Sequence, residues 1–306
     1  MNVEKRKNIL GWIAVGISLL IALLWTIWGM LENFHEGWYA SSIWQNLFLM
    51  LIQYIPFSLA FILMPLIAMR WRRMGLIIYI GLGIFCAFFF AGASFFVTYL
   101  MLAIPLTGLG LLFFFGNAQP RRLAVFLLTV LPISLMIIIA IPNIIRIQAR
   151  LNDGDFSTRL VDCQGQPLYW AGRGPGFPEQ GVTWADAQDA CTHLSADGTE
   201  LFEDEQNLWR LPDIEEAVRC QTRDGENAGG TWDAENETAN YLNTPDKESP
   251  IWDSYSEIIY YWTGEWVPDR ENYAYIIDYK GGIFKKNMLY SPAYQTFRCV
   301  KVGERK

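Results

Sequence analysis

The sequence predicts a chain in two parts of different fold class: transmembrane helices over residues 1–150 and an α+β domain over residues 151–306. Long apolar runs without charge fill the first part, and four of the five cysteines lie in the second. Charge divides at the same place. Residues 1–150 hold ten bases and three acids, a net charge of +7, whereas the remaining 14 bases and 28 acids give −14.

This division argues against several classes of protein. A soluble single-domain enzyme would not gather its apolar residues into one half of the chain. The acidic second part argues against a nucleic-acid partner, which requires a basic surface. Aromatic residues make up 15% of the chain, which argues against intrinsic disorder.

Five membrane spans are predicted from the apolar runs, because a bilayer core of about 30 Å requires about 20 apolar residues as helix. The spans cover approximately residues 9–31, 43–69, 75–91, 94–116 and 123–145. The third and fourth are separated near Ala91–Ser94, where small residues permit a tight turn. No Asp, Glu, Lys, Arg or His lies inside a span, so neither a proton relay nor an ion pathway is predicted.

The distribution of bases predicts the orientation, since Lys and Arg favour the cytoplasmic side. With five spans, eight bases fall on one side: Lys5, Arg6, Lys7, Arg70, Arg72, Arg73, Arg121 and Arg122. The 32–42 loop, which has two Glu and no Lys or Arg, falls on the other. We therefore expect a multi-pass protein of the plasma (inner) membrane. Its amino terminus is cytoplasmic, and residues 151–306 are periplasmic or extracellular.

The cysteines of the second part indicate disulfides. Four of them, Cys163, Cys191, Cys220 and Cys299, form an even set in an oxidising compartment, which predicts two bridges. Four cysteines allow three connectivities, and their spacing does not choose among them. No pair has CxxC spacing, so no zinc site is expected.

Local signals predict the elements of the second part. Residues 161–170 are typical of a strand or hairpin. Thr183 can cap a helix that runs through Leu194, and Asp213 can cap a second helix with Glu216 completing a capping box. Residues 222–257 are expected to be a long loop region. Strands are predicted at 258–267, 273–279, 283–289 and 297–300, with a turn at Lys280–Gly282.

Five sequence blocks in this part resemble a known family. In order they are Trp184-x-x-Ala187-x-x-x-Cys191-x-x-Leu194, Trp209-Arg210-Leu211-Pro212-Asp213-x-Glu215-Glu216, Tyr261-Trp262-Thr263, Ala274 to Gly282, and Phe297-Arg298-Cys299-Val300. This order resembles the Lcl C-terminal domain family, a bacterial extracellular module related to the C-type-lectin-like fold, over roughly residues 158–303. The resemblance implies a small twisted antiparallel sheet flanked by two helices, with long loops over one end. It also implies that Cys191 is joined to Cys299, and with it the pair Cys163–Cys220.

The chain departs from this family at two places. Gly264-Glu265-Trp266 stands where the family usually has a serine-rich stretch, and an acidic insertion covers Asp197–Glu205. Some family members are thought to bind sulfated polysaccharides. A net charge of −14 argues against such a polyanion as the ligand of residues 151–306.

Candidate ligand-binding residues lie in the loop-rich end of the predicted domain. Tryptophan rings can stack on sugars, and carboxylate or amide oxygens are the ligands that Ca²⁺ prefers. The candidates are Trp232, Asp233, Glu235, Trp252, Asp253, Trp266, Asp269 and Asn272. No run has EF-hand spacing, so we predict no cofactor and keep Ca²⁺ as an alternative. We interpret Trp184, Trp209, Arg210, Leu211, Pro212 and Trp262 as architectural, with Trp209 buried and Arg210 paired with an acid.

Motifs of catalysis are missing from the sequence, which holds no Gly-x-Ser-x-Gly elbow, HExxH or phosphate loop. We therefore predict a non-enzymatic envelope protein that is anchored in the lipid bilayer and presents a lectin-like module outside the cell. Its ligand would be a glycan, a cell-wall fragment or a protein. The alternatives are a structural subunit of a membrane complex and an enzyme that modifies envelope polymers.

Overall fold

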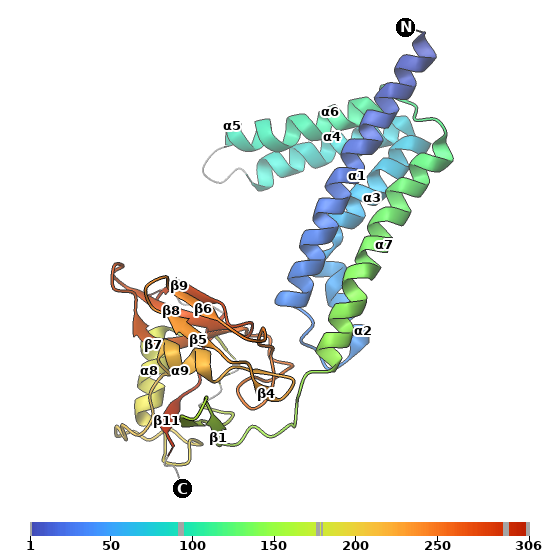
Figure 1. The fold of residues 1–306 in the computed structure, drawn as a ribbon. Coiled ribbons are helices and arrows are strands. Elements are labelled where there is room, and N and C mark those ends of the chain that lie inside the picture. Colours follow the sequence, from blue (N-terminus) through green and yellow to red (C-terminus); the bar gives the residue numbers. More distant parts are fainter. Residues whose placement is uncertain (1, 91–94, 176–177, 179, 290–293, 304–306) are drawn as a thin grey trace. The chain divides into compact units, whose positions relative to one another are not determined.

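The chain folds into two compact units, Met1–Ile144 (unit 1) and Ile145–Lys306 (unit 2) (Figure 1). This computed structural model describes residues 2–90, 95–175, 178, 180–289 and 294–303. Unit 2 begins inside the last turn of the helix α7, a few residues before the boundary expected at residue 150.

Unit 1 is built from apolar helices. They are α1 (Val3–His35), α2 (Ile43–Leu49), α3 (Pro56–Arg70), α4 (Arg72–Phe89), α5 (Phe95–Thr98), α6 (Ile104–Phe115) and α7 (Arg121–Gln148). The π-helical segments η1 (Met50–Tyr54) and η2 (Tyr99–Ala103) follow α2 and α5. The expected turn at 91–94 lies outside the described residues.

Within the described residues, three helices are long and apolar enough to cross a bilayer: α1, α4 and α7. The pair formed by residues 43–54 and 56–70 is bent by 67° and would make a fourth if it is one span. The apolar helix Tyr99–Phe115 is shorter. By length and composition these are helices of a membrane protein. The five-span count stays a prediction.

Small and polar side chains bring the helices of unit 1 into close contact. The hydroxyls of Thr26 on α1 and Ser58 on α3 share a hydrogen bond of 2.6 Å in a buried position. A Cβ on Gly29 would lie 2.2 Å from the carbonyl oxygen of Tyr54, and one on Gly75 would lie 2.4 Å from Ala68. Such contacts are typical of helices in membranes, where apolar burial alone does not bring helices together.

The connections at one end of unit 1 meet beside the start of α1. The backbone N–H of Asn117 donates to the carbonyl of Lys7 at 2.8 Å, and that of Gln119 donates to the Asn8 side chain at 2.8 Å. Arg72 and Arg121, which begin α4 and α7, line one pocket with Gly11 of α1. The eight bases counted above therefore gather at a single end, which we call the basic end. In Figure 1, α4 and α6 run side by side at a steep angle to α1 and α3.

Unit 2 contains two main sheets and two short hairpins. Its strands are β1 (Arg159–Asp162), β2 (Pro167–Trp170), β3 (Thr222–Arg223), β4 (Glu226–Asn227), β5 (Thr231–Asp233), β6 (Thr238–Asn240), β7 (Tyr260–Trp266), β8 (Tyr273–Asp278), β9 (Ile283–Asn287), β10 (Gln295–Thr296) and β11 (Val300–Val302). One sheet has the order β1-β2-β11 and is antiparallel. The other has the order β10-β7-β8-β9, with only β10 parallel to its neighbour.

Both helices of unit 2 begin at the predicted caps. The Thr183 hydroxyl accepts the N–H of Asp186 at the start of α8 (Trp184–His193). Asp213 and Glu216 form the reciprocal capping box of α9 (Ile214–Arg219). Both caps are confirmed. They could be predicted because a cap depends on residues only three positions apart in the sequence.

Two disulfides fasten these elements together. Cys191 on α8 is joined to Cys299 just before β11, and Cys163 after β1 is joined to Cys220 at the end of α9. This is the pairing that the family resemblance implies. Closing such long loops contributes on the order of 4 kcal/mol each in the chain-entropy model.

The region 222–257 differs from the predicted long loop. It contains the hairpins β3–β4 and β5–β6, followed by residues 245–254, which we call the buried segment. Its charged residues Asp246, Lys247 and Glu248 are each almost fully buried. The Asp-Lys-Glu-Ser composition is typical of a solvated loop, and the sequence gives no sign that partners elsewhere in the chain compensate these charges.

Asp246 is the centre of this burial. Its carboxylate accepts the Arg150 Nε–H at 2.8 Å and lies 3.3 Å from Arg223 Nη1 and 3.6 Å from Arg146 Nε. The Asp246 side chain is 1% exposed and that of Arg150 is 4% exposed. A buried charge is tolerated only when it is paired in this way. These contacts fix the segment that follows α7 to the core of unit 2.

Asp246→Asn should destabilise unit 2 by about 3–5 kcal/mol, because it leaves buried guanidinium groups without their carboxylate. Hydrogen exchange of the unit 2 amides in the full-length protein measures the loss. Asp224→Asn is the matched control, since Asp224 also pairs with Arg223 but is 73% exposed. Equal protection in the two variants would contradict this role of Asp246.

Candidate functional site

Five of the six residues interpreted as architectural are buried in unit 2, and the sixth, Arg210, is exposed. The Trp209 ring is buried and its Nε1–H donates to the Ser195 carbonyl at 2.8 Å. Arg210 forms two hydrogen bonds with the Glu216 carboxylate, at 2.7 and 2.5 Å. Trp184 and Trp262 are also buried, as are Leu211 and Pro212. These contacts agree with the predicted roles of a buried Trp and an Arg paired with an acid.

Two of the candidate ligand-binding residues are part of the interior. Trp252 is 1% exposed, stacks on Tyr261 with ring centroids 3.8 Å apart, and donates to Gln221. Asp253 is buried and accepts the N–H of Tyr255 at 2.8 Å. Their burial argues against a ligand-binding role, because both side chains lie inside unit 2 rather than at its surface.

The other six candidates divide between two places. Trp232, Asp233 and Glu235 lie on the β5–β6 hairpin, whereas Trp266, Asp269 and Asn272 lie at the end of β7 and in the turn to β8. Trp266 packs edge to face on Trp184 of α8 at 5.7 Å. Trp232 instead packs edge to face on Tyr275, with ring centroids 6.3 Å apart. It packs against the hydrophobic core cluster that includes residues of α9. Since Trp266 is opposite Ala274 while Tyr275 is the next residue on β8, the two tryptophans lie on opposite faces of the sheet.

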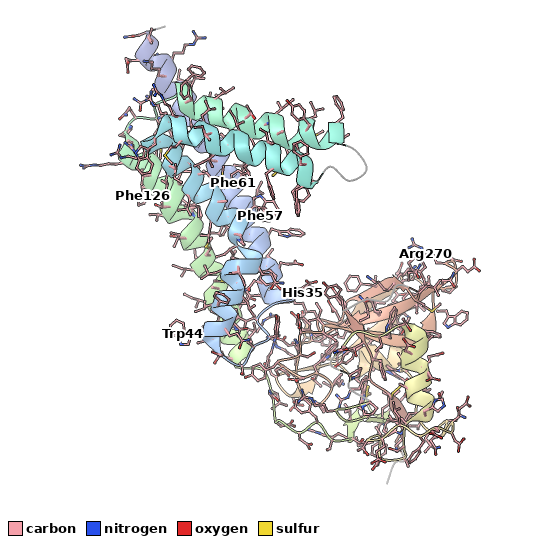
Figure 2. The ribbon with its side chains drawn as sticks, turned by 180° about the vertical axis from the view of Figure 1, so that it is seen from behind. His35, Trp44, Phe57, Phe61, Phe126 and Arg270 are labelled. Atoms are coloured by element: carbon pink, nitrogen blue, oxygen red, sulfur yellow. A yellow bond between two sulfur atoms is a disulfide. The ribbon has the colours of Figure 1, made fainter. Side chains whose placement is uncertain are left out.

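The β5–β6 hairpin is held over the sheet by a carboxylate. Glu237, in the turn of this hairpin, accepts hydrogen bonds from the Tyr275 hydroxyl at 2.6 Å and from Lys285 Nζ at 2.5 Å. Lys285 is directly opposite Tyr275 on the neighbouring strand and lies 5.7 Å from its ring centroid. We call the group Trp232, Glu237, Arg270, Tyr273, Tyr275 and Lys285 the hairpin face. Arg270, at the outer surface of unit 2 in Figure 2, packs over Tyr273.

The hydrogen bonds of the hairpin face keep the Glu237 carboxylate charged and the Tyr275 hydroxyl neutral. Hydrogen bonds from Lys285 and Tyr275, together with the nearby charge of Arg270, hold the pKa of Glu237 below its usual value. Burial, followed by the hydrogen bond to Glu237, raises the pKa of Tyr275 to about 12. Glu237 also adopts a φ of +49°, a conformation that glycine accepts more readily. The chain thus places a carboxylate at a turn where a glycine would be less strained.

Evidence for a Ca²⁺ site is weak where the structure describes the chain. No three His, Cys, Asp or Glu side chains converge there in a way that could hold a metal ion. Asp233 directs its oxygens to its own turn, accepting from the backbone of Glu235 and from the backbone and side chain of Asn236. These bonds hold the pKa of Asp233 below its usual value.

Sequence reasoning missed every member of the hairpin face except Trp232, and the hydrogen-bonded group at its centre is Glu237, Tyr275 and Lys285. Each belongs to a segment that was correctly expected to be a loop or a strand, but their meeting depends on strand register across 38–48 residues. A second feature was also missed. A groove of about 560 Å³ runs beside β11, lined by Trp209, Arg210 and Lys301 among others.

Comparison with known proteins adds one finding. Residues 2–125 match the model of a domain of unknown function, DUF7670. The matched range lies within unit 1, so it carries no information on the hairpin face. No curated protein and no solved structure matches the chain. The resemblance of unit 2 to the Lcl C-terminal domain family therefore rests on its motifs alone.

Lys247 of the buried segment predicts a pH dependence. Burial, followed by the charge of Arg150, lowers its pKa from 10.5 to about 7. Between those pH values the unfolded chain binds a proton that the folded chain does not, so the free energy of unfolding rises with pH by up to about 1.4 kcal/mol per unit. Lys247→Met should flatten this rise, as measured by hydrogen exchange of unit 2 from pH 7 to 10. Lys286→Met is the control, and parallel profiles for Lys247→Met and wild type would contradict the expectation.

Proposed function

We propose that this protein is a non-enzymatic envelope protein whose unit 2 is a lectin-like binding module, anchored by unit 1 and presented on the outer side of the plasma membrane. The hairpin face is the proposed binding site. The ligand class is a neutral or cationic glycan or cell-wall fragment, because residues 151–306 carry a net charge of −14.

The hydrogen bonds of Glu237 carry this proposal. They fix an aromatic side chain, Trp232, and a charged pair, Glu237–Lys285, side by side on a rigid sheet. An aromatic platform with a few oriented polar groups is the usual composition of a small-ligand site. The antiparallel β7–β8–β9 sheet carries Tyr273, Tyr275 and Lys285 of this surface on paired strands.

Binding is favoured over catalysis by the pairing of the polar groups. Glu237 is already occupied by Lys285 and Tyr275, and its lowered pKa makes it a poor general base. The order of the five sequence blocks supports a lectin-like domain. So do the two helices and small sheets of unit 2, which have the element types that the family resemblance implies.

The arrangement of unit 1 supports an outward unit 2. Both the α3–α4 connection and the α6–α7 connection lie at the basic end, beside the start of α1. The segment from α4 to α6 therefore begins and ends on one side, and it contributes two crossings or none. Three spans and five spans give the same result, with the basic end cytoplasmic and the chain after α7 outside. Two disulfides in unit 2 agree with an oxidising compartment.

Binding to a glycan and peptidoglycan-fragment array, with and without Ca²⁺, tests the function in the detergent-purified full chain. Trp232→Ala and Glu237→Gln should each lower the affinity of any ligand found by about tenfold or more, as expected for a central aromatic or charged contact. Trp266→Ala is the matched control. It removes the more exposed tryptophan, 64% accessible, from the opposite face of the sheet.

Two outcomes would contradict the proposal. Equal losses in Trp232→Ala and Trp266→Ala would remove the hairpin face as the site. Absence of any ligand, together with stoichiometric co-purification of a second membrane protein, would instead favour a structural subunit.

Cysteine labelling in intact spheroplasts tests the orientation. In a Cys86→Ala background, a membrane-impermeant maleimide should label unit 2 only after reduction, because its four cysteines are paired. Asn2→Cys, added to the same background, should be labelled only after permeabilisation. Labelling of Asn2→Cys in intact spheroplasts would reverse the proposed topology.

A further inference from the structure

A small pocket at the basic end of unit 1 is lined by two arginines from distant parts of the chain. Arg72 begins α4 and Arg121 begins α7, and the pocket between them is completed by Gly11, Met69, Phe113 and residues 116–118. Its cavity volume is about 20 Å³, and the pocket opens to solvent. The backbone approaches closely at its floor, since a Cβ on Gly11 would lie 2.2 Å from the backbone nitrogen of Ala118.

The positive charge of this pocket has no protein counterpart. The lining includes no acid, and among the described residues neither Arg72 nor Arg121 forms an ion pair. The acid nearest to this end in sequence, Glu4, lies 3.8 Å from Lys7. Both arginines are exposed residues at the lining of this pocket, so an anion bound there can accept charge-assisted hydrogen bonds from either guanidinium.

The N-termini of α4 and α7 add further positive charge at this pocket. Helix N-termini carry partial positive charge and favour acids in their first turn, yet α4 and α7 have no acid there. Instead α4 begins with Arg72-Arg73 and α7 with Arg121-Arg122. No side chain caps the first N–H groups of α4. An anion between the arginines would compensate the guanidinium charges and both helix ends together.

We propose that this pocket binds the phosphate of an anionic glycerophospholipid. The arginines stand at the ends of apolar helices, where headgroups lie, and basic pockets between membrane helices are known sites for such headgroups. Met69 and Phe113 supply apolar surface in the pocket, and Met74 and Leu123, two residues along the same helices, are exposed. The inference depends on unit 1 alone and not on the function proposed for unit 2.

Native mass spectrometry of the delipidated full-length protein tests the site. The probes are a phosphatidylglycerol, a phosphatidylcholine with the same acyl chains, and inorganic phosphate. Wild type should retain phosphatidylglycerol in preference to phosphatidylcholine, and the double variant Arg72→Gln/Arg121→Gln should lose about tenfold or more of that retention. The matched control is Arg73→Gln/Arg122→Gln, which removes the same charge one residue along in each helix but lies outside the pocket lining. It should behave as wild type.

The outcomes separate a built site from general attraction. Equal losses in the two double variants would overturn the proposal, because diffuse charge would then explain the binding. Retention in Arg72→Gln/Arg121→Gln would overturn it as well. Inorganic phosphate that binds where phosphatidylglycerol does not would overturn the lipid as the source of the phosphate. If Arg72→Gln/Arg121→Gln does not fold, Arg72→Lys/Arg121→Lys is compared with Arg73→Lys/Arg122→Lys, and only the former should lose the preference for phosphatidylglycerol.

Discussion

The free-energy cost of removing a charge from water determines the organisation of both units. In unit 1 the apolar runs contain no Asp, Glu, Lys, Arg or His, and the bases gather at one end. In unit 2 the same cost requires that every buried charge find a partner. The buried Asp246 carboxylate pairs with three arginines, and the buried Arg298 guanidinium donates hydrogen bonds to the carbonyl oxygens of Ala171 and Ile251. Burial still lowers the pKa of Arg298 to about 10.

These buried charges explain why unit 2 forms one body. Arg298 belongs to the block at the end of the chain, yet it holds the carbonyl of Ile251 in the buried segment. Arg150, which follows α7, holds Asp246 at the start of that segment. The buried segment therefore connects the first and last parts of unit 2, and the β5–β6 hairpin just before it is placed over the sheet. The position of the hairpin face depends on interactions made some distance away.

Local features of this fold could be predicted from the sequence, whereas distant pairings could not. The Thr183 and Asp213 caps are set by residues three positions apart, and apolar runs long enough for a bilayer locate the helices of unit 1. Asp246 was not recognised because its partner Arg150 is 96 residues away. Trp252 and Trp266 carry the same side chain in similar surroundings of sequence. Trp252 is core because it belongs to the buried segment, whereas Trp266 is exposed at the end of β7.

The two disulfides overlap along the chain, since Cys191 lies between Cys163 and Cys220 while its partner Cys299 lies beyond both. A single peptide-bond cleavage anywhere between residues 163 and 299 therefore leaves both fragments covalently joined. The surface turns of unit 2, including the tip of the β5–β6 hairpin, can be nicked by a protease without release of either piece. Unit 2 would then behave as a two-chain domain that comes apart only when a reductant follows the protease.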